Sequence, residues 1–142
     1  MSEDFVTYEL AVKLKDKGFR EKCIAYYWEK INEHTPSFVV EDNMPEDGLD
    51  ILDLLSNHNQ AEWSPFIDAP TISQVLKWLR EEKKMHIIVE IADSGWYYTI
   101  YPNIRWENGK LKSDTYIMSF KNKESYEQAA LAGIEYTLNN LI

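Results

Sequence analysis

The chain has 142 residues, a length typical of one domain, so we expect residues 1–142 to form a single globular domain. Hydrophobic residues make up 44% of the sequence and charged residues 27%, a composition that argues against intrinsic disorder. The single cysteine, Cys23, excludes an internal disulfide and is typical of a reducing compartment. We find neither a signal peptide nor an apolar run of the roughly 18 residues that a membrane helix needs, so we expect a cytoplasmic protein with no membrane partner.

The net charge of −9 comes from one acidic stretch between Ile31 and Leu76. This stretch has no lysine or arginine and contains nine acids: Glu33, Glu41, Asp42, Glu46, Asp47, Asp50, Asp53, Glu62 and Asp68. The fifteen acidic and fifteen basic residues elsewhere balance each other. Because an acidic surface repels phosphate groups, we expect no nucleic-acid partner there. Such a surface favours a cation or a basic protein instead.

The first elements are a helix and two strands. In "TYELAVKLKDKGF", Thr7 is a candidate N-cap, and Leu10 and Leu14 repeat at helical spacing. Gly18 stands where a helix ends in a left-handed residue. The aromatic stretch "CIAYYWEKI" predicts a strand, and "SFVVE" (37–41) predicts a second strand that pairs with it.

An irregular acidic segment is expected from about residue 42 to 69, within the same domain. A short helix around 48–57 fits its leucines, and prolines and a glycine interrupt the flanks. A loop region of this length is uncommon in a compact domain and often carries function.

The stretch "APTISQVLKWLREEKKMHIIVE" predicts a helix that leads directly into a strand. Thr71 and Gln74 form a capping-box pattern. One apolar stripe follows, with Trp78 flanking it: Ile72, Val75, Leu76 and Leu79. The alternation in "HIIVEI" predicts a strand, and Asp93-Ser94-Gly95 predicts a turn into a returning strand, "WYYTIY".

The last third predicts a second hairpin and a C-terminal helix. Glu107-Asn108-Gly109-Lys110 is a turn signal, and "SDTYIMSF" predicts the next strand. Ser125 and Gln128 form another capping box before an apolar stripe. We therefore expect an α+β fold, with an antiparallel sheet of four to five short strands and three to four helices packed mainly on one face.

Most catalytic signatures are absent. The five glycines are scattered, so there is no phosphate-binding loop, and no HExxH, CxxC or GxSxG motif occurs. The three histidines lie far apart in sequence, and "EDNMPEDGLD" lacks the ligand pattern of a calcium loop. Cys23 has no candidate base nearby and is expected to be a buried thiol. We therefore predict no catalytic residue, no metal ligand and no cofactor, and the sequence leaves open whether the protein is an enzyme.

Aromatic side chains give the candidate binding residues. On the strand 96–101, Trp96 and Tyr98 share one face, and Tyr97, Thr99 and Tyr101 share the other. Helices on one side of a sheet cannot cover both sets. The second set is covered by the 42–69 segment, forms an interface, or stacks on a small ligand.

The candidate site combines aromatic side chains with carboxylates of the acidic segment: Trp28, Trp96, Tyr98, Asp47 and Asp50. The tryptophans and the tyrosine would supply apolar surface, and the two aspartates would supply polar contacts.

Several strings also resemble a known group of proteins: "VTYELAVKLKDKGF", "CIAYY", "APTISQVLKWLREEKKMHI", "GW" at 95–96 and "YEQAALAGIEYTL". They are similar to small uncharacterised proteins of gut Bacteroidetes and their phages or integrated elements. The matching strings cover about half of the chain and consist of caps, stripes and a strand. The resemblance implies a cytoplasmic, phage-derived accessory protein, and it carries over no catalytic residue.

Four functional hypotheses remain open. The first is a non-enzymatic protein-interaction module that self-associates through an aromatic sheet face or an edge strand, without a deep polar pocket. The second is a small-molecule or carbohydrate binder in which exposed aromatics meet loop carboxylates. The third is a hydrolase whose loop carboxylates converge with shifted pKa values. The fourth is an acidic mimic that occupies a nucleic-acid-binding protein.

Overall fold

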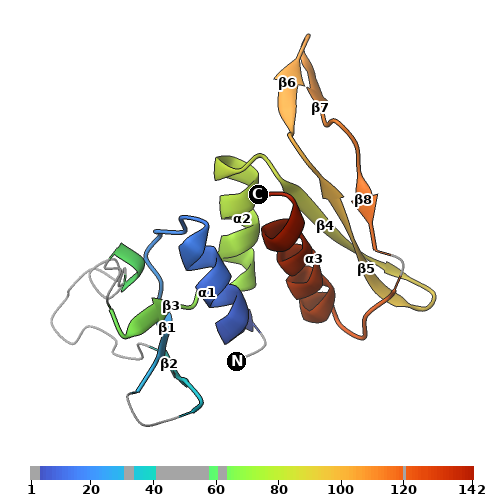
Figure 1. Cartoon of the computed structure of the whole chain (residues 1–142). Coiled ribbons are helices and arrows are strands. Elements are labelled where there is room, and N and C mark those ends of the chain that lie inside the picture. The colour runs from blue at the N-terminus through green and yellow to red at the C-terminus, as the bar shows by residue number, and fades with distance from the viewer. Residues whose placement is uncertain (1–3, 31–33, 41–57, 61–63, 120) are drawn as a thin grey trace, which may run out of the picture. The chain divides into compact units, whose positions relative to one another are not determined.

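The computed structural model describes residues 4–30, 34–40, 58–60, 64–119 and 121–142 (Figure 1). The chain divides into two compact units, which we call the N-terminal unit (Phe5–Thr71) and the C-terminal unit (from Ile72 to Ile142). Of the nine acids in the acidic stretch, all but Asp68 lie outside the described residues. The expectation of one domain over residues 1–142 stays a prediction.

Helix α1 (Tyr8–Asp16) begins and ends as its sequence predicts. The Thr7 hydroxyl accepts a hydrogen bond from the Leu10 N–H at 3.3 Å, which caps the first turn. Gly18 has a φ of +95°, a left-handed conformation that glycine adopts without steric cost. Leu10 and Leu14 are buried, so the predicted apolar stripe is confirmed.

Strands β1 (Ala25–Trp28), β2 (Ser37–Val40) and β3 (Phe66–Asp68) form an antiparallel sheet in the order β2-β1-β3. The first two lie where the sequence predicted strands. The third lies in the 42–69 segment, in which we expected a short helix but no strand. It is a strand because β1 supplies hydrogen-bond partners from a distant part of the chain. The short helix expected around 48–57 falls outside the described residues.

The C-terminal unit contains two helices and a series of short strands, in the order α2 (Ile72–Glu82), β4 (His86–Ala92), β5 (Gly95–Tyr101), β6 (Arg105–Glu107), β7 (Lys110–Lys112), β8 (Ile117–Met118) and α3 (Tyr126–Asn140). Strands β4, β5 and β8 form one antiparallel sheet in that order, and β6 and β7 form a separate hairpin. Figure 1 shows this hairpin projecting beyond the end of the β4-β5-β8 sheet.

Helix α2 buries most of the stripe that its sequence predicts, with one exchange. Ile72, Val75 and Leu79 are buried. Trp78, which we expected at the flank, is buried at 4% exposure, whereas Leu76 is only half-buried. Trp78 follows Val75 by three residues, so a small rotation of the helix brings its large ring inward in place of Leu76.

Helix α3 begins at the predicted cap. The Ser125 hydroxyl accepts from the Gln128 N–H at 3.1 Å, and the Gln128 side chain accepts from the Glu124 N–H at 3.2 Å. One orphan donor of the first turn and the N–H of the residue before the cap are thereby satisfied. The buried face of the helix, which includes Gly133 and Ile134, packs against β4 and β5.

The fold is α+β and its sheets are antiparallel, as the sequence predicts. The strands differ from the expected single sheet of four to five, because over the described ranges they divide into sheets of three, three and two strands. Over the same ranges there are three α-helices. No helix in this part of the chain is both long and apolar enough to cross a membrane.

Candidate functional site

The two faces of the β4-β5 hairpin have different surroundings. The register pairs Ile87 with Ile100 and Val89 with Tyr98, so these side chains share one face. That face lies against α3: a Cβ added to Gly133 would meet Ile87 Cγ2 and Tyr98 Cγ, each at 3.1 Å. Ile100 is completely buried there.

The opposite face carries a second set of side chains, which point away from α3. The pairs on this face are His86 with Tyr101, Ile88 with Thr99, and Glu90 with Tyr97. The His86 and Tyr101 rings lie 6.5 Å apart at 29°, close to stacked. Tyr101 also lies 6.3 Å from the ring of Tyr116 in the segment before β8. Three rings therefore lie in a row on the face that α3 leaves uncovered.

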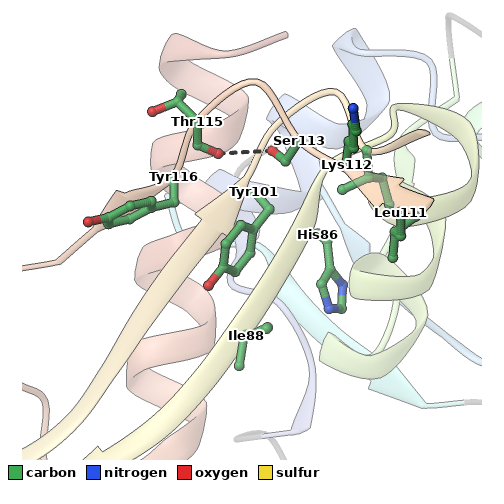
Figure 2. Close-up of a pocket in the computed structure, with 9 residues that line it drawn as sticks. His86, Ile88, Tyr101, Leu111, Lys112, Ser113, Thr115 and Tyr116 are labelled. Carbon is green, nitrogen blue, oxygen red and sulfur yellow. Dashed lines mark hydrogen bonds between the residues drawn. The ribbon is translucent and has the colours of Figure 1, made fainter. Parts of the chain in front are cut away.

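A pocket of about 450 Å³ lies beside this row. Figure 2 shows His86, Ile88 and Tyr101 on the two strands, with Leu111 and Tyr116 contributed by the segment that follows β5. Pockets of roughly 300–1,000 Å³ with mostly apolar linings are typical of small-ligand sites. Its lining, taken over the residues that the structure describes, includes one lysine, Lys112, and no carboxylate.

The segment from Pro102 to Tyr116, which we call the arm, carries the β6-β7 hairpin. Its turn is Asn108-Gly109, with φ values of +53° and +76°. Positive φ at both positions is typical of the type I′ turn that matches the twist of a two-residue hairpin. The turn predicted from the sequence is therefore confirmed.

A polar network holds the base of the arm. Arg105 Nη1 donates to Asp114 Oδ1 at 2.8 Å, and Asn103 Nδ2 donates to Asp114 Oδ2 at 2.9 Å. The hydrogen bond from Asn103 and the charge of Arg105 hold the pKa of Asp114 below its usual value. The Ile104 N–H donates to the Lys84 carbonyl at 2.9 Å, which ties the arm to the turn between α2 and β4.

The Ser113 hydroxyl adds a further link at the base of the arm. It lies 2.6 Å from the Pro102 carbonyl and 2.9 Å from the Thr115 carbonyl, so it donates to one of these two oxygens (Figure 2). The base of the arm is therefore held more firmly than its tip.

The two faces of the arm hairpin have different chemistry. On one face Arg105 lies 3.2 Å from Glu107, and Lys112 lies 4.0 Å from the same carboxylate. On the other face Trp106 is paired with Leu111, and they are 76% and 61% exposed. None of the six strand residues of this hairpin is buried.

The exposed apolar pair continues into the pocket. Leu111 lines the pocket together with Tyr116, which is itself 61% exposed. We call Trp106, Leu111 and Tyr116 the arm surface. Large exposed aromatic and aliphatic side chains that adjoin each other are typical of binding surfaces.

His86 is the titratable group of this pocket whose pKa is shifted by its surroundings. Burial, with a smaller contribution from the charge of Arg80, lowers the pKa of His86, so its imidazole is neutral at neutral pH. Its Nδ1 is buried and has no hydrogen-bond partner among the described residues. Among the described residues that line the pocket, none is a carboxylate that could pair with His86.

The residues predicted as binding residues lie in different places. Tyr98 is 9% exposed and Trp96 is half-buried, and both face α3, where the Trp96 ring lies 5.9 Å from Tyr126. Trp28 belongs to the N-terminal unit and is 40% exposed, with its ring 5.9 Å from Phe66. The structure therefore brings Trp96 and Tyr98 together on one strand. Asp47 and Asp50 lie outside the described residues, and the binding role of all five stays a prediction.

A second pocket, of about 440 Å³, adjoins Tyr98. Its charged lining residues are Lys121 and Lys123, so it lacks the carboxylates that we expected beside the aromatic rings. The combination of aromatic rings and loop acids is thus not found among the residues that line this pocket.

Asp68 is a buried acid in the described part of the N-terminal unit. It is completely buried, and its Oδ2 accepts from the Asn59 N–H at 3.1 Å while its own N–H donates to Asn59 Oδ1 at 3.1 Å. Burial raises the pKa of Asp68, although the Asn59 N–H and His58 act in the opposite direction. This reciprocal pair fixes the 3₁₀ helix His58–Gln60 to β3, which is a structural role.

The described residues include no group of three or more His, Cys, Asp or Glu side chains that could hold a metal ion. The loop acids on which a carboxylate hydrolase would depend, such as Asp47 and Asp50, lie outside these residues. That hypothesis therefore stays a prediction.

The sequence analysis did not identify the arm surface. It selected Trp96 and Tyr98, which lie on the face of β5 that packs against α3. One signal in the sequence could have found the arm surface. Trp106 and Leu111 are placed symmetrically about the Asn108-Gly109 turn, which makes them a cross-strand pair. Tyr101 was assigned to the second aromatic face, but not to a site.

Comparison of the chain with protein-family models, with curated proteins and with solved structures found no match.

Proposed function

We propose that the protein is a non-enzymatic interaction module that binds another protein through the arm surface. The observation that carries this proposal is the exposed Trp106–Leu111 pair, on a hairpin in which no strand residue is buried. Because no strand residue of the hairpin is buried, packing in a core does not explain why Trp106 and Leu111 are apolar. An isolated two-stranded hairpin is also at best marginally stable in water. Tryptophan and tyrosine are also the side chains most enriched at the centres of protein interfaces.

The sequence resemblance supports a setting for this function. Strings such as "YEQAALAGIEYTL" are similar to proteins of gut Bacteroidetes and their phages or integrated elements. We therefore propose a cytoplasmic accessory protein of a phage or mobile element, whose activity lies in the partner that it binds.

The first test compares two variants of the arm hairpin in quantitative affinity capture from cells that contain the natural partners. Trp106→Ala removes the exposed ring. Lys110→Ala is the matched control, because it removes an exposed side chain from the opposite face of the same hairpin. A central aromatic anchor contributes about 2 kcal/mol or more, so a partner should bind roughly 30-fold or more weakly to the Trp106→Ala protein.

The control should leave the captured proteins unchanged. Equal recovery of every captured protein by both variants would contradict the proposal. A partner that is lost with Trp106→Ala can then be purified, and its dissociation constants for the two variants measured by calorimetry.

A second candidate function is the binding of a small planar molecule in the pocket beside His86, Tyr101 and Tyr116. The volume of about 450 Å³ and the row of three rings favour it. A screen by thermal shift tests it, because a pocket ligand should lose its effect in Tyr101→Ala and keep it in Lys110→Ala.

A further inference from the structure

Strand β4 is an edge strand with an unusually apolar sequence. It lies at one end of the order β4-β5-β8 and reads His-Ile-Ile-Val-Glu-Ile-Ala, with Glu90 as its one carboxylate. Edge strands are usually short, or carry lysine, proline or a bulge that prevents pairing with other chains. β4 has seven residues and pairs with β5 along its whole length, without a bulge.

The hydrogen bonds that β5 makes on the side away from β4 show which backbone N–H and carbonyl groups of β4 point toward β5 and which point outward. The Trp96 N–H and carbonyl bond to Lys123 at 2.8 and 2.6 Å, and the Tyr98 carbonyl accepts from the Ser119 N–H at 3.0 Å. Backbone groups alternate along a strand, so Trp96 and Tyr98 bond away from β4, and the residues between and after them bond toward it.

The partners of Tyr97, Thr99 and Tyr101 in the register are Glu90, Ile88 and His86, so those three β4 residues bond to β5. The N–H and carbonyl groups of Ile87, Val89 and Ile91 therefore point to the outer edge. Among the described residues of the C-terminal unit, none provides a hydrogen-bond partner for these outward groups.

We propose that β4 pairs with β4 of a second copy of the chain, antiparallel, with the two-fold axis at Ile88. The inference goes beyond the proposed function, because the outer backbone edge of β4 includes no residue of the arm surface, although His86 and Ile88 line the same pocket as Leu111 and Tyr116. Antiparallel pairing of identical strands is isologous, so one edge supplies both halves of the interface. The three-stranded sheets of the two copies then join into one sheet of six strands.

The chemistry of the side chains selects this register. With the axis at Ile88, His86 of one copy lies opposite Glu90 of the other, twice in the dimer, and Ile87 lies opposite Val89. An imidazole N–H can donate to the facing carboxylate, and the apolar pairs exclude water. An axis at Glu90 would instead place two carboxylates opposite each other, which is unfavourable.

The register also uses the outward backbone groups. Ile87 and Val89 point to the outer edge, so each Ile87–Val89 pair exchanges two backbone hydrogen bonds, and Ile88 faces its own copy in a pair without hydrogen bonds. Each copy has the pocket beside His86 and Tyr101 on its open face, so the dimer carries two such pockets on one continuous sheet. A contact between two seven-residue strands is smaller than the roughly 1,200 Å² of a standard interface, so we expect a dimer that dissociates in the micromolar range.

The first experiment measures the dimerisation constant of the full chain by sedimentation velocity over a range of concentrations. Val89→Pro removes the outward N–H, and proline is tolerated on an edge strand where that N–H faces solvent. Val89→Ala is the matched control, because it removes the same side chain but keeps the N–H. Two backbone bonds per dimer are lost with proline, so the dissociation constant should rise by about tenfold or more relative to the alanine variant.

Far-UV circular dichroism checks that both variants keep the wild-type fold. A wild-type protein that stays monomeric at every concentration would overturn the proposal. Equal dissociation constants for two folded variants would overturn it as well.

The second experiment tests the register by disulfide trapping, and it stands even where the proline variant does not fold. In a Cys23→Ser background, Ile88→Cys should give a disulfide-linked dimer on mild oxidation. Facing residues in a pair without hydrogen bonds have Cα atoms about 4.5 Å apart, within disulfide range. Glu90→Cys is the control, because with the axis at Ile88 the two Cα atoms at 90 are about 13 Å apart.

Cross-linking at 88 and not at 90 supports the proposal. Equal cross-linking of the two, or cross-linking of a Val89→Cys variant in place of Ile88→Cys, overturns it. Both experiments here measure pairing between copies of the chain, and neither substitutes a residue of the arm surface. A negative result therefore leaves the test with Trp106→Ala standing, and a failure of that test leaves this one standing.

Discussion

Replacing Gly95 by alanine tests how the chain after β8 lies against β5. Gly95 has a φ of +132°, which an L side chain rarely adopts, and a Cβ there would lie 2.5 Å from the Lys123 carbonyl oxygen. This oxygen accepts from the Trp96 N–H, so the Lys123 backbone cannot move away without losing that bond. The backbone strain costs about 1–3 kcal/mol, and each of the two Trp96–Lys123 hydrogen bonds that must stretch contributes about 1 kcal/mol. We expect Gly95→Ala to lower the free energy of unfolding of the C-terminal unit by about 3 kcal/mol or more.

Gly109→Ala is the matched control in the same unit. Gly109 also has a positive φ, +76°, but a Cβ there would meet no atom within 4 Å. Only the left-handed backbone conformation is penalised, at about 1 kcal/mol. Urea titration followed by tryptophan fluorescence gives both values from midpoint shifts at constant slope. If Gly95→Ala costs no more than Gly109→Ala, the Lys123 segment does not run against β5 as described.

Further predictions concern single side chains and can be checked by the same titration. Ile100→Ala should lower the free energy of unfolding by about 3 kcal/mol, because Ile100 is completely buried. Ile91→Ala should lower it by less than about 0.5 kcal/mol, because Ile91 is 68% exposed. Similar costs would contradict the assignment of one side chain to the core and the other to the surface. Burial raises the pKa of Asp68 above its unfolded value of 3.8, so its contribution to stability is present at low pH and is lost as the pH rises through the folded pKa. Asp68→Asn should therefore gain stability relative to the wild type as the pH rises above 3.8, and a pH-independent difference would speak against this. Ser125→Ala removes the cap of α3 and should cost about 1 kcal/mol, and an unchanged midpoint would mean that this cap contributes nothing.

The local elements could be predicted from the sequence because each depends on residues a few positions apart. Thr7 and Ser125 cap their helices as predicted, since a cap needs only a hydroxyl and the amide two or three residues later. The Asn108-Gly109 turn was equally clear, because a type I′ turn requires two residues with positive φ. The α+β class and the antiparallel pairing followed from these elements.

The partition into sheets could not be predicted, because it depends on contacts between distant residues. Phe66 pairs with Trp28 across a long acidic segment, and no local pattern marks that pairing. The sequence therefore indicated strands without showing that those of the two units belong to different sheets.

The candidate site could be predicted only in part. Alternation along β5 separated Trp96 and Tyr98 from Tyr101, but it did not show which set the helix covers. Gly133 decides this, because the absence of a side chain lets α3 approach the Tyr98 ring closely. A glycine within the apolar stripe of a helix is thus a signal that a large ring lies opposite, and it directs attention to the other face of the sheet.

Site-specific photocrosslinking tests the central claim about the arm surface most directly. A photoreactive phenylalanine derivative is introduced at Leu111 or at Lys110, neighbours whose side chains lie on opposite faces of β7. If the face with Trp106 and Leu111 binds a partner protein, irradiation in cells should give a discrete cross-linked species from position 111 and little or none from position 110. Equal cross-linking from both positions, or from 110 alone, would contradict the account.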